Sequence, residues 1–458
     1  MSDHPACTLS TTLPDPIEVG GGTVVYVDGF LGATEPGRPV ALRLGPVEQK
    51  LLASGLPETG SRGRGRRFAG FVDLPAGTPT GEVELVLVVE TDSVTKPLHL
   101  ARTTIVTRSA KPAPPPPSVI GGDGTLIAIA MATWEPDRER FREQLESLRA
   151  QSWPNWICVI SDDASSAEAF AGLRAVVGAD DRFVISRSED RRGFYFNFER
   201  AIRMAPAEAS LIALCDQDDR WDADKLEALA ATLAANPRAS LAYSDNRIRL
   251  DDGAAGFDSA FTERRNSYDD IASLLVANTV TGAASIFRRE LLEVALPFPP
   301  APGVPYHDHW LALCALASGE IAYLDRPTYD RIRHLDSVTM LARGGRGGPP
   351  GRQERRRARL QKLRSARGAA GWRPFYFNRY LRIAHFARVL ELRLGDRIAV
   401  KKRRAIHRLI AADRSFGPVI WLALRSLRPW LGRDETFGIE RNLVAGVLWK
   451  RLASRRGR

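Results

Sequence analysis

The stretch "SLIALCDQDDRWDADKLEAL", residues 210–229, joins an apolar run to three carboxylates and then to a helical pattern. The apolar part has the length and composition of a buried strand, and a helical pattern resumes at Trp221. Asp216, Asp218 and Asp219 therefore follow the end of a strand and precede a helix. A strand that leads into a helix predicts an α/β domain with parallel strands, which bind ligands beyond their carboxyl ends.

The same rhythm of strand and helix extends over residues 124–340. "TLIAIAMAT" predicts a buried strand, and in "DRERFREQLESLRAQ" the residues Phe141, Leu145 and Leu148 share one helical face. A second strand, "WICVIS", runs directly into an acidic pair, Asp162 and Asp163. Because parallel strands end at the same edge of a sheet, we expect this pair and the 216–219 cluster on one edge.

The residues before this domain have a different character. Residues 17–108 alternate short β-rich runs with Gly and Pro turns, and "GEVELVLVVE" places apolar residues on one face of a strand. These features predict a small β-sandwich accessory domain over residues 1–110. Residues 111–123 contain four consecutive prolines, which predict a semi-rigid linker.

The acidic cluster has two interpretations from the residues alone. Asp219 or Asp222 suits the N-cap of the following helix. Asp216 and Asp218 have no such duty, and residues two apart lie on the same side of an extended segment. Hard oxygen ligands in this arrangement favour Mg²⁺ or Mn²⁺ shared with substrate phosphates.

Several stretches occur together in a recognisable order between residues 124 and 340. They are "IAMATWEPDRERFREQLESLRAQSWPNWICVISDDAS", "NFERAI", "IALCDQDDRWDADKLE", "AYSDNRI", "NTVTGAASIFRRELLEVALPFP" and "YHDHWLALCALASGEIAYLD". As a set they resemble family 2 glycosyltransferases of the GT-A fold, in particular the rhamnosyltransferase-like branch. The resemblance implies a Rossmann-like, mostly parallel sheet and covers about half of the chain.

The resemblance implies roles for residues on the nucleotide side. Thr133, Asp162 and Asp163 correspond to positions beside the nucleobase and ribose of a nucleotide diphosphate-sugar. Gly193 also matches the donor-binding pattern, although "RRGFYFNFERA" replaces the commoner asparagine-glycine sequence. Arg192 is either a phosphate contact or a solvated surface residue.

The metal and the catalytic base come from the same resemblance. Asp216 and Asp218 form the DxD element for Mg²⁺ or Mn²⁺, and Asp216 also contacts either ribose or metal. His334 aligns with a family histidine that completes the metal shell, with a structural role as the alternative. Asp308 corresponds to the base, and we expect the start of a helix to favour its charged form. A zinc site with His307 and His309 is the sharper alternative, but it has too few ligands.

The C-terminal quarter carries an unusual charge. Residues 341–458 contain 31 Lys and Arg against 7 Asp and Glu, net +24, whereas residues 1–340 have a net charge of −13. Such a tail attracts a polyanion, either nucleic acid or an anionic membrane. We expect an Arg-rich mobile segment and then amphipathic helices, and we expect residues 372–458, which include "PFYFNRYLRIAHFARVLELRLG", to bind an anionic membrane surface. A helical bundle packed on the catalytic domain is the third interpretation.

The predicted function is inverting, metal-dependent transfer of a sugar, plausibly rhamnose, from a nucleotide diphosphate-sugar to a glycan or lipid-linked acceptor in cell-surface polysaccharide synthesis. The scattered cysteines, with no secretion signal and no apolar run long enough to span a bilayer, favour a cytoplasmic enzyme on the inner face of the plasma membrane. The alternatives are a catalytically silent carbohydrate-binding protein and a nucleic-acid-binding protein acting through the basic tail.

Overall fold

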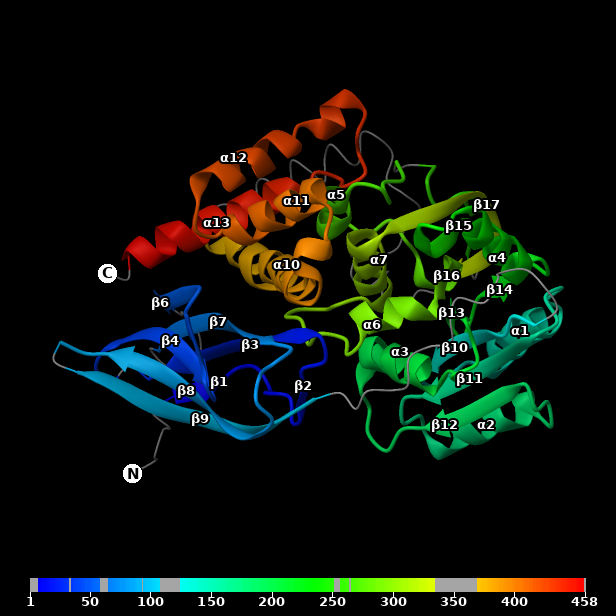
Figure 1. The fold of residues 1–458 in the computed structure, drawn as a ribbon, viewed down its shortest axis with the longest axis horizontal. Helices are drawn as coiled ribbons and strands as arrows, with labels where there is room; N and C mark the ends of the chain where they lie inside the picture. The colour runs from blue at the N-terminus through cyan, green and yellow to red at the C-terminus, as the bar shows by residue number, and fades with distance from the viewer. Residues whose placement is uncertain are drawn as a thin grey trace.

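The chain folds into an N-terminal β domain, a larger α/β domain and a group of C-terminal helices (Figure 1). This computed structural model describes residues 7–32, 34–57, 65–92, 94–107, 124–250, 256–262, 265–333 and 369–456. The expected linker at 111–123 and the Arg-rich segment at 343–368 lie outside the described residues. Buried apolar residues of the α/β domain and the C-terminal helices belong to one core, and most of those in the β domain form a second.

The N-terminal domain consists of two β-sheets around a common core. One sheet contains, in spatial order, β1 (Cys7–Leu9), β3 (Gly22–Leu31), β7 (Arg66–Pro75) and β6 (Ala53–Pro57). The other contains β2 (Ile17–Glu18), β9 (Thr95–Val106), β8 (Gly81–Glu90), β4 (Arg38–Leu44) and β5 (Val47–Lys50). Leu85, Leu87 and Val89 of β8 are buried between the sheets, which agrees with the alternation in the sequence.

The α/β domain is built on one sheet of eight strands. In spatial order they are β12 (Phe183–Arg187), β11 (Trp156–Asp162), β10 (Ile127–Thr133), β13 (Leu211–Cys215), β16 (Ser285–Arg288), β15 (Ala239–Leu250), β17 (Glu320–Arg333) and β14 (Arg220–Trp221). The first four are mutually parallel, and β15 is parallel to β17. β16 and β14 run antiparallel to their neighbours. The prediction of an α/β fold with a mostly parallel sheet is confirmed.

Helices connect these strands. They are α1 (Arg138–Arg149), α2 (Ala167–Val177), α3 (Gly193–Met204), α4 (Lys225–Ala235), α5 (Ile271–Val276), α6 (Leu292–Ala295) and α7 (His307–Ser318), with the 3₁₀ turns η1 (Gly282–Ala284) and η2 (Arg289–Leu291). Phe141, Leu145 and Leu148 of α1 are buried on one face, as predicted. Asp137 caps this helix by accepting a hydrogen bond from the backbone N–H of Arg140 at 3.1 Å.

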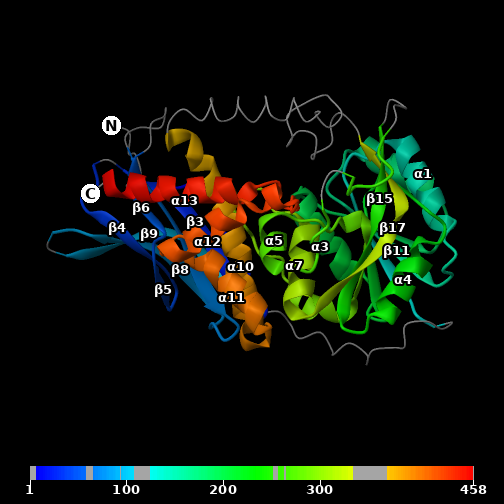
Figure 2. The same cartoon turned by 90° about the horizontal axis from the view of Figure 1, so that it is seen from above.

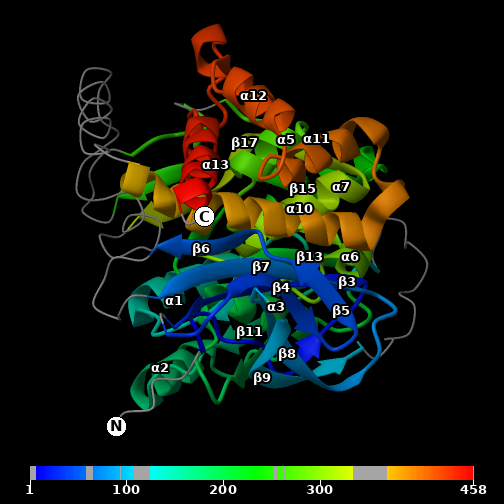
Figure 3. The same cartoon turned by 90° about the vertical axis from the view of Figure 1, so that its left-hand side faces the viewer.

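The C-terminal residues form η3 (Ala369–Trp372), the π-helical turn η4 (Phe375–Tyr380), α10 (Leu381–Leu394), η5 (Gly395–Arg397), α11 (Val400–Ala411), α12 (Phe416–Arg425), η6 (Arg428–Leu431) and α13 (Ile439–Arg456). α10 lies between the β domain and the helices α5 and α7 of the α/β domain, as Figures 2 and 3 show. Across the described ranges, no helix has both the length and the apolar character needed to cross a bilayer.

The position of α10 corrects one expectation. The apolar face predicted to enter a membrane is buried inside the protein, with Leu381, Ile383, Phe386, Val389 and Leu390 all in the core. Polar side chains of the same helix also bind the β domain. Nε2 of its His385 is 2.7 Å from the carbonyl oxygen of Val24, and Arg388 forms an ion pair with Asp73. For this helix the packed-bundle interpretation is the correct one, because both of its sides meet folded domains.

Arg393 of α10 joins the two domains directly. Its buried guanidinium donates to the carbonyl oxygens of Gly22 at 2.8 Å, Val294 at 2.7 Å and Pro297 at 2.7 Å. We expect Arg393→Met to lower the free energy of unfolding by about 3 kcal/mol, on the order of 1 kcal/mol for each lost bond. Urea denaturation measures this change. The control Arg397→Met, at an exposed position one turn later, should differ little from the wild type, and equal effects would contradict the assignment.

Candidate active site

The ends of β10 and β11 meet through a buried hydrogen-bond network. Thr133 and Asp162 are paired in register, and the Thr133 hydroxyl donates to Asp162 Oδ1 at 3.2 Å. Asp162 is fully buried and also accepts from the backbone N–H of Ser165 at 3.0 Å and from the Ser165 hydroxyl at 2.6 Å. These bonds fix the loop that follows β11, because they occupy both carboxylate oxygens of Asp162.

Asp163 is held by the start of α3. Its Oδ1 accepts from the backbone N–H of Arg192 at 2.7 Å, and its Oδ2 accepts from that of Gly193 at 2.8 Å. Gly193 has φ +77°, a conformation that favours glycine. The carboxylate thus satisfies two donors that a helix start leaves without intrahelical partners. In α3, Asn197 donates to the carbonyl oxygen of Thr133 at 3.2 Å, which ties the helix to β10.

The side chain of Arg192 lines a separate cavity of about 410 Å³. The residues around it are Glu18, Arg192, Phe196, Glu199, Arg200 and Arg203. Glu18 belongs to β2 and forms an ion pair of 2.9 Å with Arg203, so this cavity lies where the β domain meets α3. The acidic cluster at 216–219 does not line it.

The acidic loop after β13 is tied to β10 by a glutamine. Gln217 accepts from the backbone N–H of Trp134 at 2.8 Å and donates to the Trp134 carbonyl at 3.2 Å. A side-chain amide can make both bonds at once, as a neighbouring strand does. No role was expected for this residue from the sequence. Its only signal was an amide within an acidic run, and Trp134 is distant in sequence.

Asp216 lies close to several other ionisable groups. Burial, together with the negative charges of Asp218 and Asp308, raises the pKa of its carboxyl to about 6. Asp308, from the first turn of α7, is therefore near the acidic loop although it lies far away in the chain. The two stretches that the sequence linked only by resemblance come together at this point.

The expected helix cap is wrong. α4 begins at Lys225 with Asp224 at its N-cap, and no side chain caps it. Asp222 binds Arg247 instead, with 3.1 Å between Arg247 Nη1 and Asp222 Oδ2. Asp219 is buried, and its Oδ2 has no hydrogen-bond partner among the described residues. Tertiary contacts with β15 therefore outweigh the local preference for a capped helix.

Two cations lie among the carboxylates. Lys225 is fully buried, with its ammonium 3.4 Å from the centre of the Trp221 ring, and it donates to the carbonyl oxygen of Ala283. Burial lowers the pKa of Lys225 to about 7. Arg331 of β17 is the second. Burial opposes its charge, but acidic neighbours that include Asp219, Asp216 and Asp308 raise its pKa overall. Neither cation was expected at the site from the sequence.

Asp308 is a half-buried carboxylate in the first turn of α7. It accepts from the backbone N–H of His309 at 2.6 Å, from that of Gly282 and from the side chain of Asn278. Burial nevertheless raises its pKa from 3.8 to about 6. The donors at the helix start favour the charged form, as expected, but desolvation exceeds their effect.

The two flanking histidines have structural partners. His309 Nε2 is 2.7 Å from the carbonyl oxygen of Leu274, and the His307 ring stacks on Phe198 with 3.6 Å between ring centres. Within the ranges that the structure describes, no group of three or more His, Cys, Asp or Glu side chains could hold a metal by itself. His334 lies outside the described residues.

A divalent ion shared with a diphosphate needs fewer protein ligands than an ion that is bound by protein side chains alone. Mg²⁺ is commonly bound by one or two carboxylates together with substrate phosphates. Asp216 and Asp218 offer hard oxygen donors, and the pKa of Asp216 indicates that their negative charges repel each other. Asp219 adds a buried carboxylate oxygen with no hydrogen-bond partner among the described residues. These residues fit such an ion, because a cation would reduce the repulsion between the carboxylates and would interact favourably with the Asp219 oxygen.

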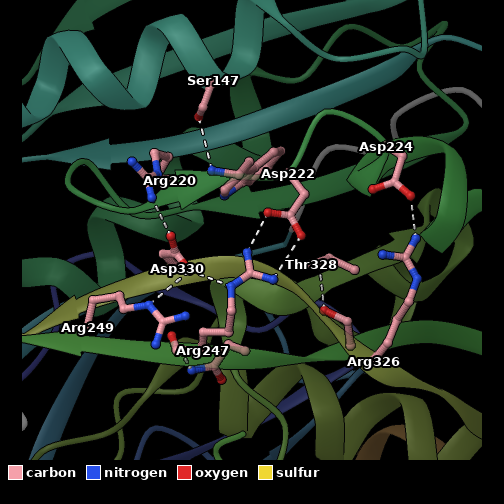
Figure 4. A network of polar contacts seen from close by, with 12 residues as sticks. Ser147, Arg220, Asp222, Asp224, Arg247, Arg249, Arg326, Thr328 and Asp330 are labelled. Atoms are coloured by element: carbon pink, nitrogen blue, oxygen red, sulfur yellow. Dashed lines mark hydrogen bonds and ion pairs between the residues drawn. The ribbon is translucent and has the colours of Figure 1, made fainter. Parts of the chain in front are cut away.

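A network of polar contacts holds the segment after the acidic loop (Figure 4). Asp330 of β17 accepts from Arg220 at 2.7 Å and from Arg247 at 2.5 Å. The hydroxyl oxygen of Ser147 in α1 accepts a hydrogen bond from the backbone N–H of Trp221 at 3.2 Å. β14 begins directly after Asp219, so the network fixes the point where the acidic loop ends.

We expect Asp330→Asn to weaken nucleotide binding about tenfold, because the loss of a charge-assisted pair loosens β14 by roughly 1.5–3 kcal/mol. Isothermal titration calorimetry measures the affinity. Asp224→Asn is the matched control, since its ion pair with Arg326 is about half exposed and contributes little. Equal affinities for the two variants would show that the network does not position the loop.

The sequence comparison decides the family of this site. Residues 129–295 match the family described as Glycosyl transferase family 2. The chain carries a family 2 glycosyltransferase domain. The matched region begins in β10 and ends with α6, so it includes Thr133, Asp162, Asp163 and Asp216. Asp308 lies beyond the matched residues.

Two curated proteins resemble parts of this chain. The uncharacterised protein y4gI of Sinorhizobium fredii is 32% identical over 124 residues, which are 27% of this chain and 13% of that protein. TuaG of Bacillus subtilis, provisionally named a teichuronic acid biosynthesis glycosyltransferase, is 22% identical over 174 residues, which are 38% of this chain and 66% of TuaG. The chain therefore spans less than two thirds of the length of either relative.

Solved structures resemble the chain more distantly. S. aureus TarS, residues 1–349, has 16% identity and a TM-score of 0.37, with 73% of this chain and 92% of that chain covered. The mannosyltransferase PcManGT from Pyrobaculum calidifontis, solved with GDP-Man and Mn²⁺, has 18% identity and a TM-score of 0.37, with 70% and 86% covered. The assignment of the glycosyltransferase domain depends on the family match and not on these two structures.

Proposed function

We propose that the protein transfers a sugar, with inversion at the anomeric carbon, from a nucleotide diphosphate-sugar to a glycan or lipid-linked acceptor in cell-surface polysaccharide synthesis. The observation that carries this proposal is the proximity of Asp308 to Asp216, which lies within the residues that match glycosyltransferase family 2. Inverting transfer needs one base near the acceptor and positive charge near the leaving diphosphate. Rhamnose as the sugar rests on the resemblance of the sequence alone.

Asp308 is the proposed base. Its carboxylate accepts the proton of the acceptor hydroxyl while that oxygen bonds to the anomeric carbon of the donor. The bond from this carbon to the diphosphate breaks at the same time, and the nucleoside diphosphate leaves with the electron pair. A base whose pKa lies near the working pH is the most effective, and the value of about 6 for Asp308 supports the role.

Asp216 and Asp218 are the proposed holders of Mg²⁺ or Mn²⁺, with His334 as a further candidate. When bound, such an ion supplies positive charge that stabilises the departing diphosphate. Arg331 contributes a fixed cation among the same carboxylates, so the cluster is not purely negative before the ion binds.

The nucleotide is proposed to lie along the ends of β10 and β11. Thr133, Asp162, Asp163 and Gly193 shape this wall. The carboxylate oxygens of Asp162 and Asp163 already accept hydrogen bonds within the protein, which favours a positioning role over direct binding of the ribose.

A thermal-shift screen of nucleotide diphosphate-sugars, with and without Mn²⁺, tests the proposal. The true donor should raise the unfolding midpoint only when Mn²⁺ is present, by an amount that grows with ligand concentration. Incubation of that donor with glycan acceptors should then release a nucleoside diphosphate. A protein that binds glycans but forms no product from any donor would be the carbohydrate-binding alternative.

We also propose that the enzyme works on the inner face of the plasma membrane, held there by residues 372–458. The net charge of +24 on residues 341–458 supports attraction to an anionic leaflet.

A further inference from the structure

The outer face of α12 and η6 is apolar and exposed. Phe416, Ile420, Leu424, Leu427 and Leu431 are between 50% and 79% exposed. Their spacing of three and four residues places them on one side of a helical segment. The opposite side of α12 is formed by Val419 and Leu422, which are buried against the rest of the protein. Both sides of this helix are therefore apolar, although only one has a partner within the described residues.

An apolar stripe of this kind is unusual on the outside of a protein. A surface helix normally presents polar residues to water, and a large exposed apolar patch marks an interaction site. α12 lies at the periphery of the molecule, outside α11 and α13, in both Figure 1 and Figure 3. No described element covers the stripe, which we name the α12 stripe and define as Phe416, Ile420, Leu424, Leu427 and Leu431.

The surroundings of the α12 stripe are strongly basic. Residues 400–456 contain 14 Lys and Arg and only four Asp and Glu. Three of these acids, Asp413, Glu435 and Glu440, are buried. Exposed cations close to the stripe in sequence include Lys401, Arg404, Arg408 and Arg414. The surface therefore combines apolar side chains with positive charge.

Some of these cations contact the helix itself. The guanidinium of Arg451 lies 4.3 Å from the centre of the Phe416 ring, and that of Arg408 lies 5.5 Å from the Trp421 ring. Long basic side chains at the edge of an apolar surface can reach lipid phosphates while the apolar residues enter the acyl region. The arrangement fits the interface of an anionic bilayer.

We propose that the α12 stripe inserts into the interface of an anionic membrane and that the basic residues around it bind the lipid headgroups. The inference rests on the proposed peripheral location. It assigns the membrane contact to α12 in place of α10, whose apolar face is buried. A second copy of the chain is a poorer partner, because two such faces would bring their positive charges together.

The α12 stripe is connected to the active site through α5. Arg425 at the end of α12 donates to Asp270 Oδ2 at 3.2 Å and to the hydroxyl of Ser273 at 2.7 Å. Arg428 donates to the same Asp270 oxygen at 3.0 Å. Asp270 caps α5, and Asn278, which follows α5, binds Asp308. A membrane held by the stripe is thus at a fixed position relative to the base, which suits a lipid-linked acceptor.

Vesicle sedimentation of the full chain tests the proposal. The probes are vesicles of phosphatidylcholine alone and of phosphatidylcholine with phosphatidylglycerol. Ile420→Asp/Leu424→Asp should reduce partition into the anionic vesicles by at least about tenfold, because two carboxylates oppose both insertion and headgroup attraction. Val184→Asp is the control, since Val184 is an exposed apolar residue on the edge strand β12, where a charge is tolerated.

Further measurements separate the possible outcomes. Arg404→Gln/Arg414→Gln should lower anionic-vesicle binding about tenfold and make it less sensitive to salt, as the headgroup contact requires. Unchanged vesicle binding by both double variants would overturn the proposal. The proposal would also be overturned if the wild-type protein were a dimer in sedimentation velocity and only Ile420→Asp/Leu424→Asp dissociated it. Transfer to a soluble acceptor should stay normal in both variants. If the wild-type protein showed no sugar transfer, that result would count against the proposed function and not against the membrane contact.

Discussion

Asparagine in place of Asp308 is expected to lower kcat for sugar transfer by about 10²- to 10⁴-fold, the range contributed by a general base. The amide has nearly the same shape and can still accept from the backbone N–H groups of His309 and Gly282, but it cannot take the proton of the acceptor hydroxyl. Nucleotide binding should change little. Steady-state assays with saturating donor, together with calorimetric titration of the nucleotide, separate the two effects.

The pKa of Asp308 gives this prediction an independent check. With a pKa of about 6, the wild-type enzyme should lose kcat/KM about tenfold for each pH unit below 6, as the base becomes protonated. Because the folded pKa is raised above 3.8, the group favours the folded state only at low pH, and this contribution is lost as the pH rises from about 4 to about 6. The asparagine variant lacks that loss, so its unfolding midpoint at pH 7 should not fall. Normal turnover by the variant would exclude Asp308 as the base.

Alanine in place of Asp218 is expected to abolish the Mn²⁺-dependent part of donor binding and to lower kcat/KM by at least about 100-fold. The variant loses one of two carboxylates that fit a shared divalent ion, and the leaving diphosphate then lacks its counter-charge. Calorimetric titration of the donor with and without Mn²⁺ measures the change.

A matched control uses another acid of the same domain. Asp258→Ala removes an exposed carboxylate whose only described ion pair is with Arg249, so its donor affinity should equal that of the wild type. An Asp218→Ala enzyme that still responds to Mn²⁺ like the wild type would show that the metal binds elsewhere.

Much of the catalytic domain followed from local patterns. The apolar runs that end in Asp162 and Asp216 predicted parallel strands, and the pairing of β10 with β11 and β13 agrees with this interpretation. The buried face of α1 followed from the spacing of Phe141, Leu145 and Leu148. These features are readable because period and composition act between residues close in the chain.

Other features of the site depend on residues that are distant in sequence. Gln217 binds Trp134, and Arg331 joins the acidic cluster from the last strand of the domain. The capping role expected of Asp219 or Asp222 failed because β15 offers Arg247 as a stronger partner for Asp222. Local propensity describes what a residue can do, whereas competition between partners decides what it does.

The sequence by itself determined the α/β character of residues 124–340, the positions of the acidic stretches at strand ends and the basic character of the C-terminal region. Only the tertiary structure decided that α10 is an internal helix and that α12 is the one with an exposed apolar face. An amphipathic pattern specifies that a helix needs an apolar partner but not which partner, because burial against a domain and insertion into a membrane reward the same side chains. The same reasoning applies to Asp308, because burial in the folded protein raises its pKa although the donors at the helix start lower it.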